Sequence, residues 1–86
     1  MSICDKVKAL GETFRGRLSD DLLDAALQYV DFNECGIALE TIGDYICETD
    51  LPISEEEYEG LLAMAQELGL DRNAGRYRYM KTLVRG

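Results

Sequence analysis

Carboxylates are the most abundant side chains capable of chemistry in this 86-residue sequence. Four glutamates crowd residues 55–59, close enough together for one to act as an acid and another as a base. Such work requires a carboxylate whose pKa has been raised toward the working pH, as an apolar pocket does. The sequence offers no apolar pocket around these residues. We therefore interpret them as the solvated first turn of a helix.

Nucleophilic and metal chemistry are excluded more directly by the residue types present. The chain has no histidine, so Ser-His and Cys-His pairs cannot form. No Cys-x-x-Cys, phosphate-binding glycine loop or calcium-binding loop is present. We expect a protein that is not an enzyme and that needs neither a cofactor nor a metal.

The three cysteines are Cys4, Cys35 and Cys47. If Cys35 and Cys47 share a helix, they lie about 18 Å apart at ~1.5 Å per residue, beyond the roughly 7 Å that a disulfide spans. We expect all three to be reduced, mostly buried thiols. No signal peptide and no apolar run of roughly 20 residues is seen. These observations predict a cytoplasmic protein.

Charge is distributed unevenly along the chain. Residues 18–71 hold fifteen acidic residues and no Lys or Arg, whereas residues 72–86 hold five basic residues and no acidic one. A concentrated negative field attracts a positive partner and speeds its association. It also repels nucleic acid and anionic membranes, so we expect direct binding to neither. Solubility alone is the alternative explanation, and the basic ends could fold back over the acidic segment.

Apolar residues recur with helical spacing throughout, and no segment alternates as a strand does. The pattern predicts an all-α, compact single-domain bundle of about five short helices, spanning residues 1–86. The expected N-caps are Ser2, Ser19, Asn33 and Ser54. The last helix is expected at about residues 72–83.

The third predicted helix has an acidic face opposite its core stripe. Apolar and aromatic residues, Ile37 and Tyr45, lie within or beside that face, as anchors do in a binding surface. Packing under a neighbouring helix is the alternative for both. Gly36 and Gly43 share a flank of this helix and predict close approach by another helix or by a partner. The predicted partner-binding residues are Asp31, Glu34, Ile37, Glu40, Asp44, Tyr45, Glu48 and Asp50.

Two segments resemble a known family. They are LQYVDFNECGIALE at residues 27–40 and DLPISEEEY at residues 50–58. Their residues are similar to the patterns A-L-x-Y-x-D-x-x-E-x-G-x-A-L-E and D-x-P-I-S-x-x-x-Y of the MafI-type immunity proteins. The resemblance covers roughly residues 22–70. The shared positions Tyr29, Asp31, Glu34, Gly36 and Pro52 also fit a structural role at the turn between the second and third helices.

The resemblance implies a cytoplasmic antidote that binds a cognate toxin domain tightly, without catalysis. Family members are associated with polymorphic and contact-dependent growth-inhibition toxins, which are commonly nucleases and include EndoU-like ribonucleases. The implied partner is the basic C-terminal domain of such a toxin. We expect the chain to be a monomer or to form a 1:1 complex.

Other functions remain open. A nucleic-acid mimic that blocks a different basic protein, or an acidic adaptor, would have the same charge pattern. An acyl carrier is disfavoured because none of Ser2, Ser19 and Ser54 lies in the Asp-Ser-Leu context that its prosthetic group requires.

Overall fold

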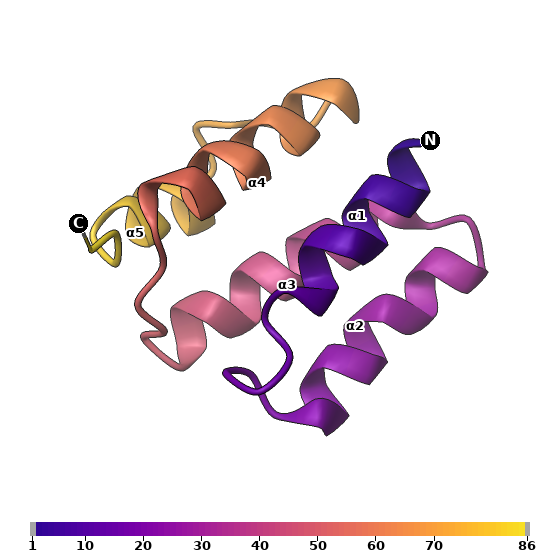
Figure 1. Ribbon diagram of the computed structural model, residues 1–86. Coiled ribbons are helices and arrows are strands. Elements are labelled where there is room, and N and C mark those ends of the chain that lie inside the picture. Colours follow the sequence, from indigo (N-terminus) through magenta and orange to yellow (C-terminus); the bar gives the residue numbers. More distant parts are fainter. Residues whose placement is uncertain (1, 86) are drawn as a thin grey trace.

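Each expected helix is present in the computed structural model, which describes residues 2–85. The helices are α1 (Ile3–Glu12), α2 (Asp20–Asp31), α3 (Cys35–Glu48), α4 (Glu55–Glu67) and α5 (Gly75–Lys81) (Figure 1). No sheet forms among the described residues. The radius of gyration is 11.6 Å, close to the roughly 12 Å expected for a compact chain of this length. The prediction of an all-α, compact bundle is confirmed.

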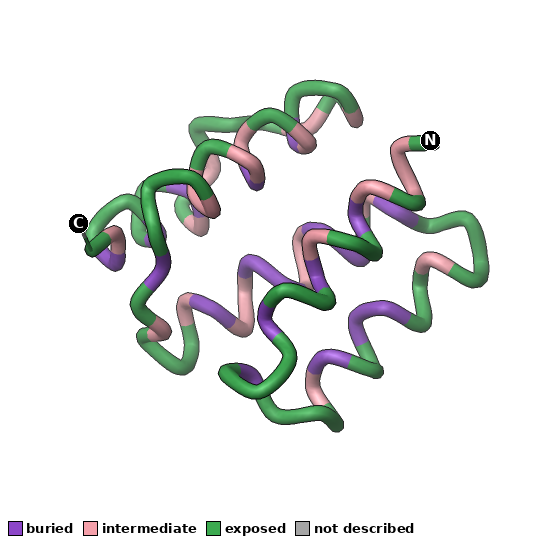
Figure 2. Tube along the Cα trace, in the orientation of Figure 1, coloured by how far each residue is buried: buried purple, intermediate pink, exposed green. Residues whose placement is uncertain are grey.

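Helix α3 is the centre of the bundle and contacts all four other helices. In Figure 1, α2 lies on one side of α3 and α4 and α5 on the other, while α1 passes in front of α3. The buried positions of every helix turn toward this interior, as Figure 2 shows. No polar or charged residue among those described is classed as buried. Burial of apolar side chains around α3 is therefore the main source of stability.

Three of the four predicted caps are confirmed. The hydroxyls of Ser2, Ser19 and Ser54 each accept a hydrogen bond from a backbone N–H in the first turn of α1, α2 and α4. These bonds satisfy backbone donors that have no partner within the helix. The prediction for Asn33 is wrong, because Asn33 has a φ of 59° whereas an N-cap is extended. Glu34 precedes α3 instead and makes no side-chain cap.

Helix α5 is shorter than predicted because a turn delays its start. Asp71 Oδ1 accepts a hydrogen bond from the Asn73 backbone N–H at 2.8 Å, a local bond that competes with helix formation. The helix then begins at Gly75 and crosses α3 at Gly43. A Cβ atom at Gly43 would lie 3.2 Å from Met80 Cε and 3.4 Å from Arg76 Cδ. The close approach expected at Gly43 is thus made by α5.

The segment after α5 is held by backbone hydrogen bonds to the α3–α4 connection. Ile53 N–H donates to Leu83 O at 3.1 Å, and Arg85 N–H donates to Ile53 O at 2.8 Å. Within the described residues, no helix combines the length and apolarity needed to cross a lipid bilayer.

Candidate functional site

The predicted acidic face of α3 is divided into two parts by α5. The C-terminal part, here called the closed end, comprises Glu40, Asp44, Glu48 and Asp50. Arg76 of α5 donates from Nε to Asp44 Oδ1 at 2.8 Å and from Nη1 to Glu40 Oε2 at 3.0 Å. The hydrogen bond to Asp44 raises the pKa of Arg76. Two of these carboxylates are therefore already neutralised within the protein.

The remaining residues of this part are partly engaged as well. The Tyr79 hydroxyl donates to the Asp50 carboxylate, and this hydrogen bond raises the pKa of Tyr79. Tyr45 is partly buried and packs against the core, which supports the packing alternative for this residue. Glu48 is exposed. Partner contacts at the closed end stay a prediction.

The N-terminal part, here called the open end, comprises Asp31, Glu34 and Ile37. Asp31 and Glu34 are exposed, and the Ile37 side chain is 42% exposed. No salt bridge involves either carboxylate among the described residues. Ile37 lies at the edge of a groove of about 330 Å³. The lining residues come from the starts of α1 and α3 and from the end of α4: Ile3, Cys4, Asn33, Glu34, Cys35, Gly36, Ile37, Glu40, Leu68 and Leu70.

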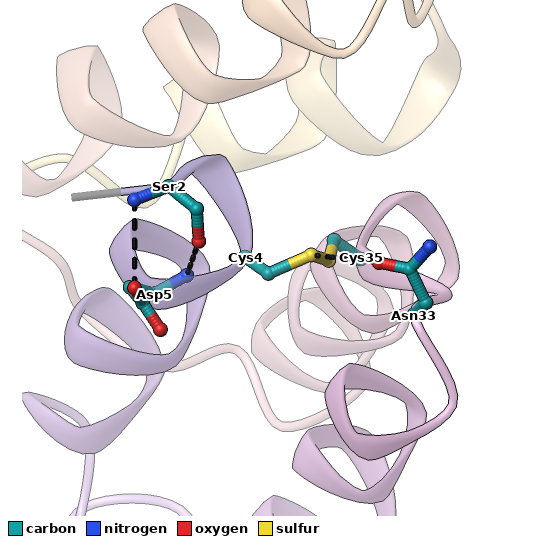
Figure 3. The surroundings of a disulfide bond; sticks show 5 residues. All are labelled: Ser2, Cys4, Asp5, Asn33 and Cys35. Carbon is teal, nitrogen blue, oxygen red and sulfur yellow. Dashed lines mark hydrogen bonds between the residues drawn. A yellow bond between two sulfur atoms is a disulfide. The ribbon is translucent and has the colours of Figure 1, made fainter.

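A disulfide between Cys4 and Cys35 joins two walls of this groove (Figure 3). The prediction that all three cysteines are reduced is wrong for this pair. The sequence argument tested only two cysteines on one helix, whereas the fold brings the first turns of α1 and α3 together. Their Cα atoms lie 5.3 Å apart, within the range that disulfides span.

The third cysteine, Cys47, is a free, half-buried thiol. Its Sγ donates to the backbone carbonyl of Arg76 at 3.3 Å. Burial raises the pKa of this thiol, and the nearby Asp44 carboxylate raises it further. A thiol with a raised pKa is a poor nucleophile, so Cys47 is interpreted as a structural residue.

Sequence reasoning missed several residues at the open end. Phe32 is 68% exposed and Tyr29 is 40% exposed, near the turn that leads into α3. Leu68 and Leu70, which follow α4, line the groove as well. The spacing of Leu70 after Gly69 was the available signal. It does not show which helix start Leu70 will face.

The basic residues outside the acidic segment do fold back over it. Lys6, Arg15, Arg17 and Arg76 form salt bridges with six of the fifteen carboxylates between residues 18 and 71: Asp20, Asp24, Glu40, Asp44, Glu57 and Glu67. The hydrogen bond from the Arg17 guanidinium lowers the pKa of Glu57. The other nine carboxylates are exposed and form no salt bridge within the described residues.

Within residues 2–85, no group of three or more Cys, Asp and Glu side chains is arranged to hold a metal ion. No protein-family model matches the sequence, and the searches of characterised proteins and of solved structures found no significant similarity. The likeness to MafI-type immunity proteins therefore rests on the two sequence segments alone.

Proposed function

We propose that this chain is a non-catalytic binding protein of the immunity type, which neutralises the basic C-terminal domain of a cognate toxin. The observation that carries the proposal is the set of nine exposed carboxylates without an internal cation. Basic residues from both ends of the chain form salt bridges with the acidic segment, and an excess of negative charge still remains there. This excess is available to a partner.

The physical mechanism is electrostatic attraction followed by close packing. A field of one sign raises the rate at which an oppositely charged protein arrives, and salt weakens that attraction. A toxin that cleaves nucleic acid must present a positive surface to its substrate. An acidic protein bound there would exclude the substrate by occupying the same surface, whether the toxin is an EndoU-like ribonuclease or another nuclease.

A cytoplasmic site of action is part of the proposal. Disulfides are rare in that reducing compartment, so we expect Cys4 and Cys35 to be thiols there. The structure has a partner for the reduced form, because Cys4 Sγ lies 3.6 Å from Asn33 Oδ1 (Figure 3). A thiol at Cys4 can donate a hydrogen bond across that distance. Alkylation of thiols in intact cells, followed by mass measurement, tests this expectation.

Co-expression tests the proposed function. The chain is produced together with the C-terminal domain of the protein encoded immediately upstream, and growth is compared with and without the chain. We expect a tight complex, rescued growth and an association rate that falls as salt rises. Absence of both complex and rescue would contradict the immunity proposal. A complex with an unrelated basic protein would favour the alternative of a nucleic-acid mimic.

A further inference from the structure

We propose that the groove at the open end of α3 selects the partner, and that its occupant is an apolar side chain carried between Lys or Arg residues on an exposed segment of the partner. The inference rests on the proposed function because it takes the partner to be basic. It adds that this chain recognises an apolar side chain of the partner as well as its positive charge. Charge alone attracts many basic proteins, so recognition requires something more specific.

The interior of the groove is apolar. Its large apolar side chains are Ile3, Ile37, Leu68 and Leu70. Leu70 reaches the start of α3, since a Cβ atom at Gly36 would lie 3.8 Å from Leu70 Cδ2. Side chains inserted into such a pocket at the centre of an interface contribute most of the binding energy. At about 330 Å³, the groove lies at the lower end of the size range of ligand pockets, roughly 300–1,000 Å³, which suits an inserted side chain.

The rim of the groove is acidic. Glu34 lines the groove and Asp71 follows the lining residue Leu70; both carboxylates are exposed and neither forms a salt bridge among the described residues. Glu40 also lines the groove and is paired with Arg76. No Lys or Arg lines the groove. The nearest cations along the chain are Lys6, which pairs with Glu67, and Arg72, which donates to the neutral amide of Gln66. An apolar segment flanked by positive charges therefore complements both the interior and the rim.

The groove is held in shape before any partner arrives. In the oxidised protein the Cys4–Cys35 disulfide joins the wall formed by α1 to the wall formed by α3, and in the reduced protein the Cys4 thiol can donate to Asn33 Oδ1 beside the start of α3. The Leu70 backbone N–H donates to Ala65 O at 2.8 Å, which fixes the chain at the end of α4. A preformed site loses less entropy on binding than one that must be ordered. Phe32, 68% exposed beside the lining residue Asn33, extends the apolar surface past the rim.

Other grooves on the molecule fit this occupant less well. The groove between α1 and α2 is larger, about 560 Å³, but Lys8 lines it and Leu27 is its one large apolar residue. The groove beside α5 contains the Arg76 side chain, which would repel a cation. The open end joins several apolar side chains to Glu34, a lining carboxylate that forms no salt bridge among the described residues.

Binding of short peptides to the oxidised, ¹⁵N-labelled protein tests the inference. The probes are a lysine-rich peptide with two central leucines, the same peptide with serines in their place, and a version with glutamates for lysines. We expect the leucine–lysine peptide to bind and to shift the amide signals of Gly36, Ile37 and Leu70. We expect the serine–lysine peptide to bind at least about tenfold more weakly and the glutamate peptide not to bind.

Two variants at similarly exposed side chains test whether the preference for the leucine peptide depends on the groove. Ile37→Ser changes a groove residue that is 42% exposed, and Tyr79→Ser changes a residue that is 45% exposed on α5. Circular dichroism and thermal unfolding verify that both remain folded. Ile37→Ser should abolish the preference for leucine over serine, and Tyr79→Ser should keep it.

The outcomes separate this inference from the proposed function. Equal binding of the two lysine peptides, or an unchanged leucine preference in Ile37→Ser, would overturn the groove as the selective element while leaving acidic attraction intact. Failure of every lysine peptide to bind at low salt would remove the acidic attraction itself, and both proposals would fall.

Discussion

The two ends of α3 carry similar acidic residues, but among the described residues carboxylates at one end are paired with a cation and those at the other end are not. At the closed end, Glu40 and Asp44 share the Arg76 guanidinium, and α5 packs on Gly43. At the open end, Glu34 has no cation, and Ile37 borders a groove with acidic residues at its rim. The difference depends on which helix lies alongside, since one α3 face runs through both ends. An acidic stripe on a helix therefore does not define a binding surface until the position of every basic helix is known.

The means of stabilisation also differ between the ends. The closed end is held by burial of Tyr77 and Met80 and by the Arg76 ion pairs. In the oxidised protein the open end is held by a covalent bond between α1 and α3. Charge pairing at the closed end compensates Glu40 and Asp44, whereas a disulfide fixes two helices and leaves the carboxylate of Glu34 without a cation among the described residues.

Removal of the disulfide should have the largest effect. Cys4 and Cys35 are separated by 31 positions, and closure of a loop of this size in the unfolded chain corresponds to about 3.7 kcal/mol in the chain-entropy treatment. We expect Cys4→Ser/Cys35→Ser to lose about 3–4 kcal/mol of unfolding free energy, measured by urea denaturation without reductant. Amide exchange should accelerate more at Cys35–Ala38 than at Gly43–Cys47.

The control for this experiment is Cys47→Ser, which removes the remaining thiol and should cost about 1 kcal/mol. Reduction of the wild-type protein should reproduce the loss seen in the double variant. An unchanged urea midpoint in both would show that the open end is held by packing, and the contrast between the ends would disappear.

Charge reversal should separate the ends in binding. Asp31→Lys/Glu34→Lys and Asp44→Lys/Glu48→Lys change the net charge by the same amount, so a difference between them reports location alone. We expect the open-end pair to weaken affinity for the basic partner about ten- to a hundredfold, or about 1.4–2.7 kcal/mol. The closed-end pair should weaken it less, because Arg76 already compensates Asp44. Isothermal titration measures both, and a larger loss at the closed end would place the interface there.

Removal of Arg76 should make the closed end resemble the open one. Arg76→Gln leaves Glu40 and Asp44 without their cation, and we expect a loss of about 1–2 kcal/mol of unfolding free energy because the pairs are only partly shielded from water. The same change should increase the association rate of a basic partner a few-fold, measured by stopped flow at low salt. Arg78→Gln is the control, since it alters the net charge equally and Arg78 forms no salt bridge within residues 2–85.

The smallest effect is expected at Tyr77, on the buried face of α5. Its side chain is 1% exposed, and its hydroxyl has no hydrogen-bond partner among the described residues. Burial raises the pKa of this phenol, so the group stays neutral. Tyr77→Phe removes an unsatisfied polar atom from the core and should leave stability unchanged or raise it by up to about 1 kcal/mol. A loss above 1 kcal/mol in thermal unfolding would reveal a hydrogen bond formed by this hydroxyl.

Local signals explain which parts of the fold were predictable. The serine caps and apolar stripes depend on residues three or four positions apart, and a sequence displays them directly. The cap prediction for Asn33 was wrong because asparagine is favoured in two different local conformations. Asparagine caps helices, but it also tolerates the left-handed conformation that ends them, and the 2.8 Å bond from Glu34 N–H to Tyr29 O completes the turn that way.

Long-range pairing explains what was missed at the site. The acidic face of α3 was predicted correctly as a helical face, but its division required knowing that Arg76, thirty-two residues beyond Asp44, crosses that face. The Cys4–Cys35 bond depends on two helix starts meeting in space. The groove depends on Leu70 as well. None of these contacts leaves a periodic pattern in the sequence.

The distance along the chain between Asp44 and Arg76 also sets an order of events during synthesis. Their separation of 32 residues corresponds to roughly 2–6 s of translation at 5–20 residues per second. Glu40 and Asp44 are therefore synthesised seconds before the residue that pairs with them. The closed end can acquire its cation only when the chain is almost complete, so its charge pairing is a late event in folding.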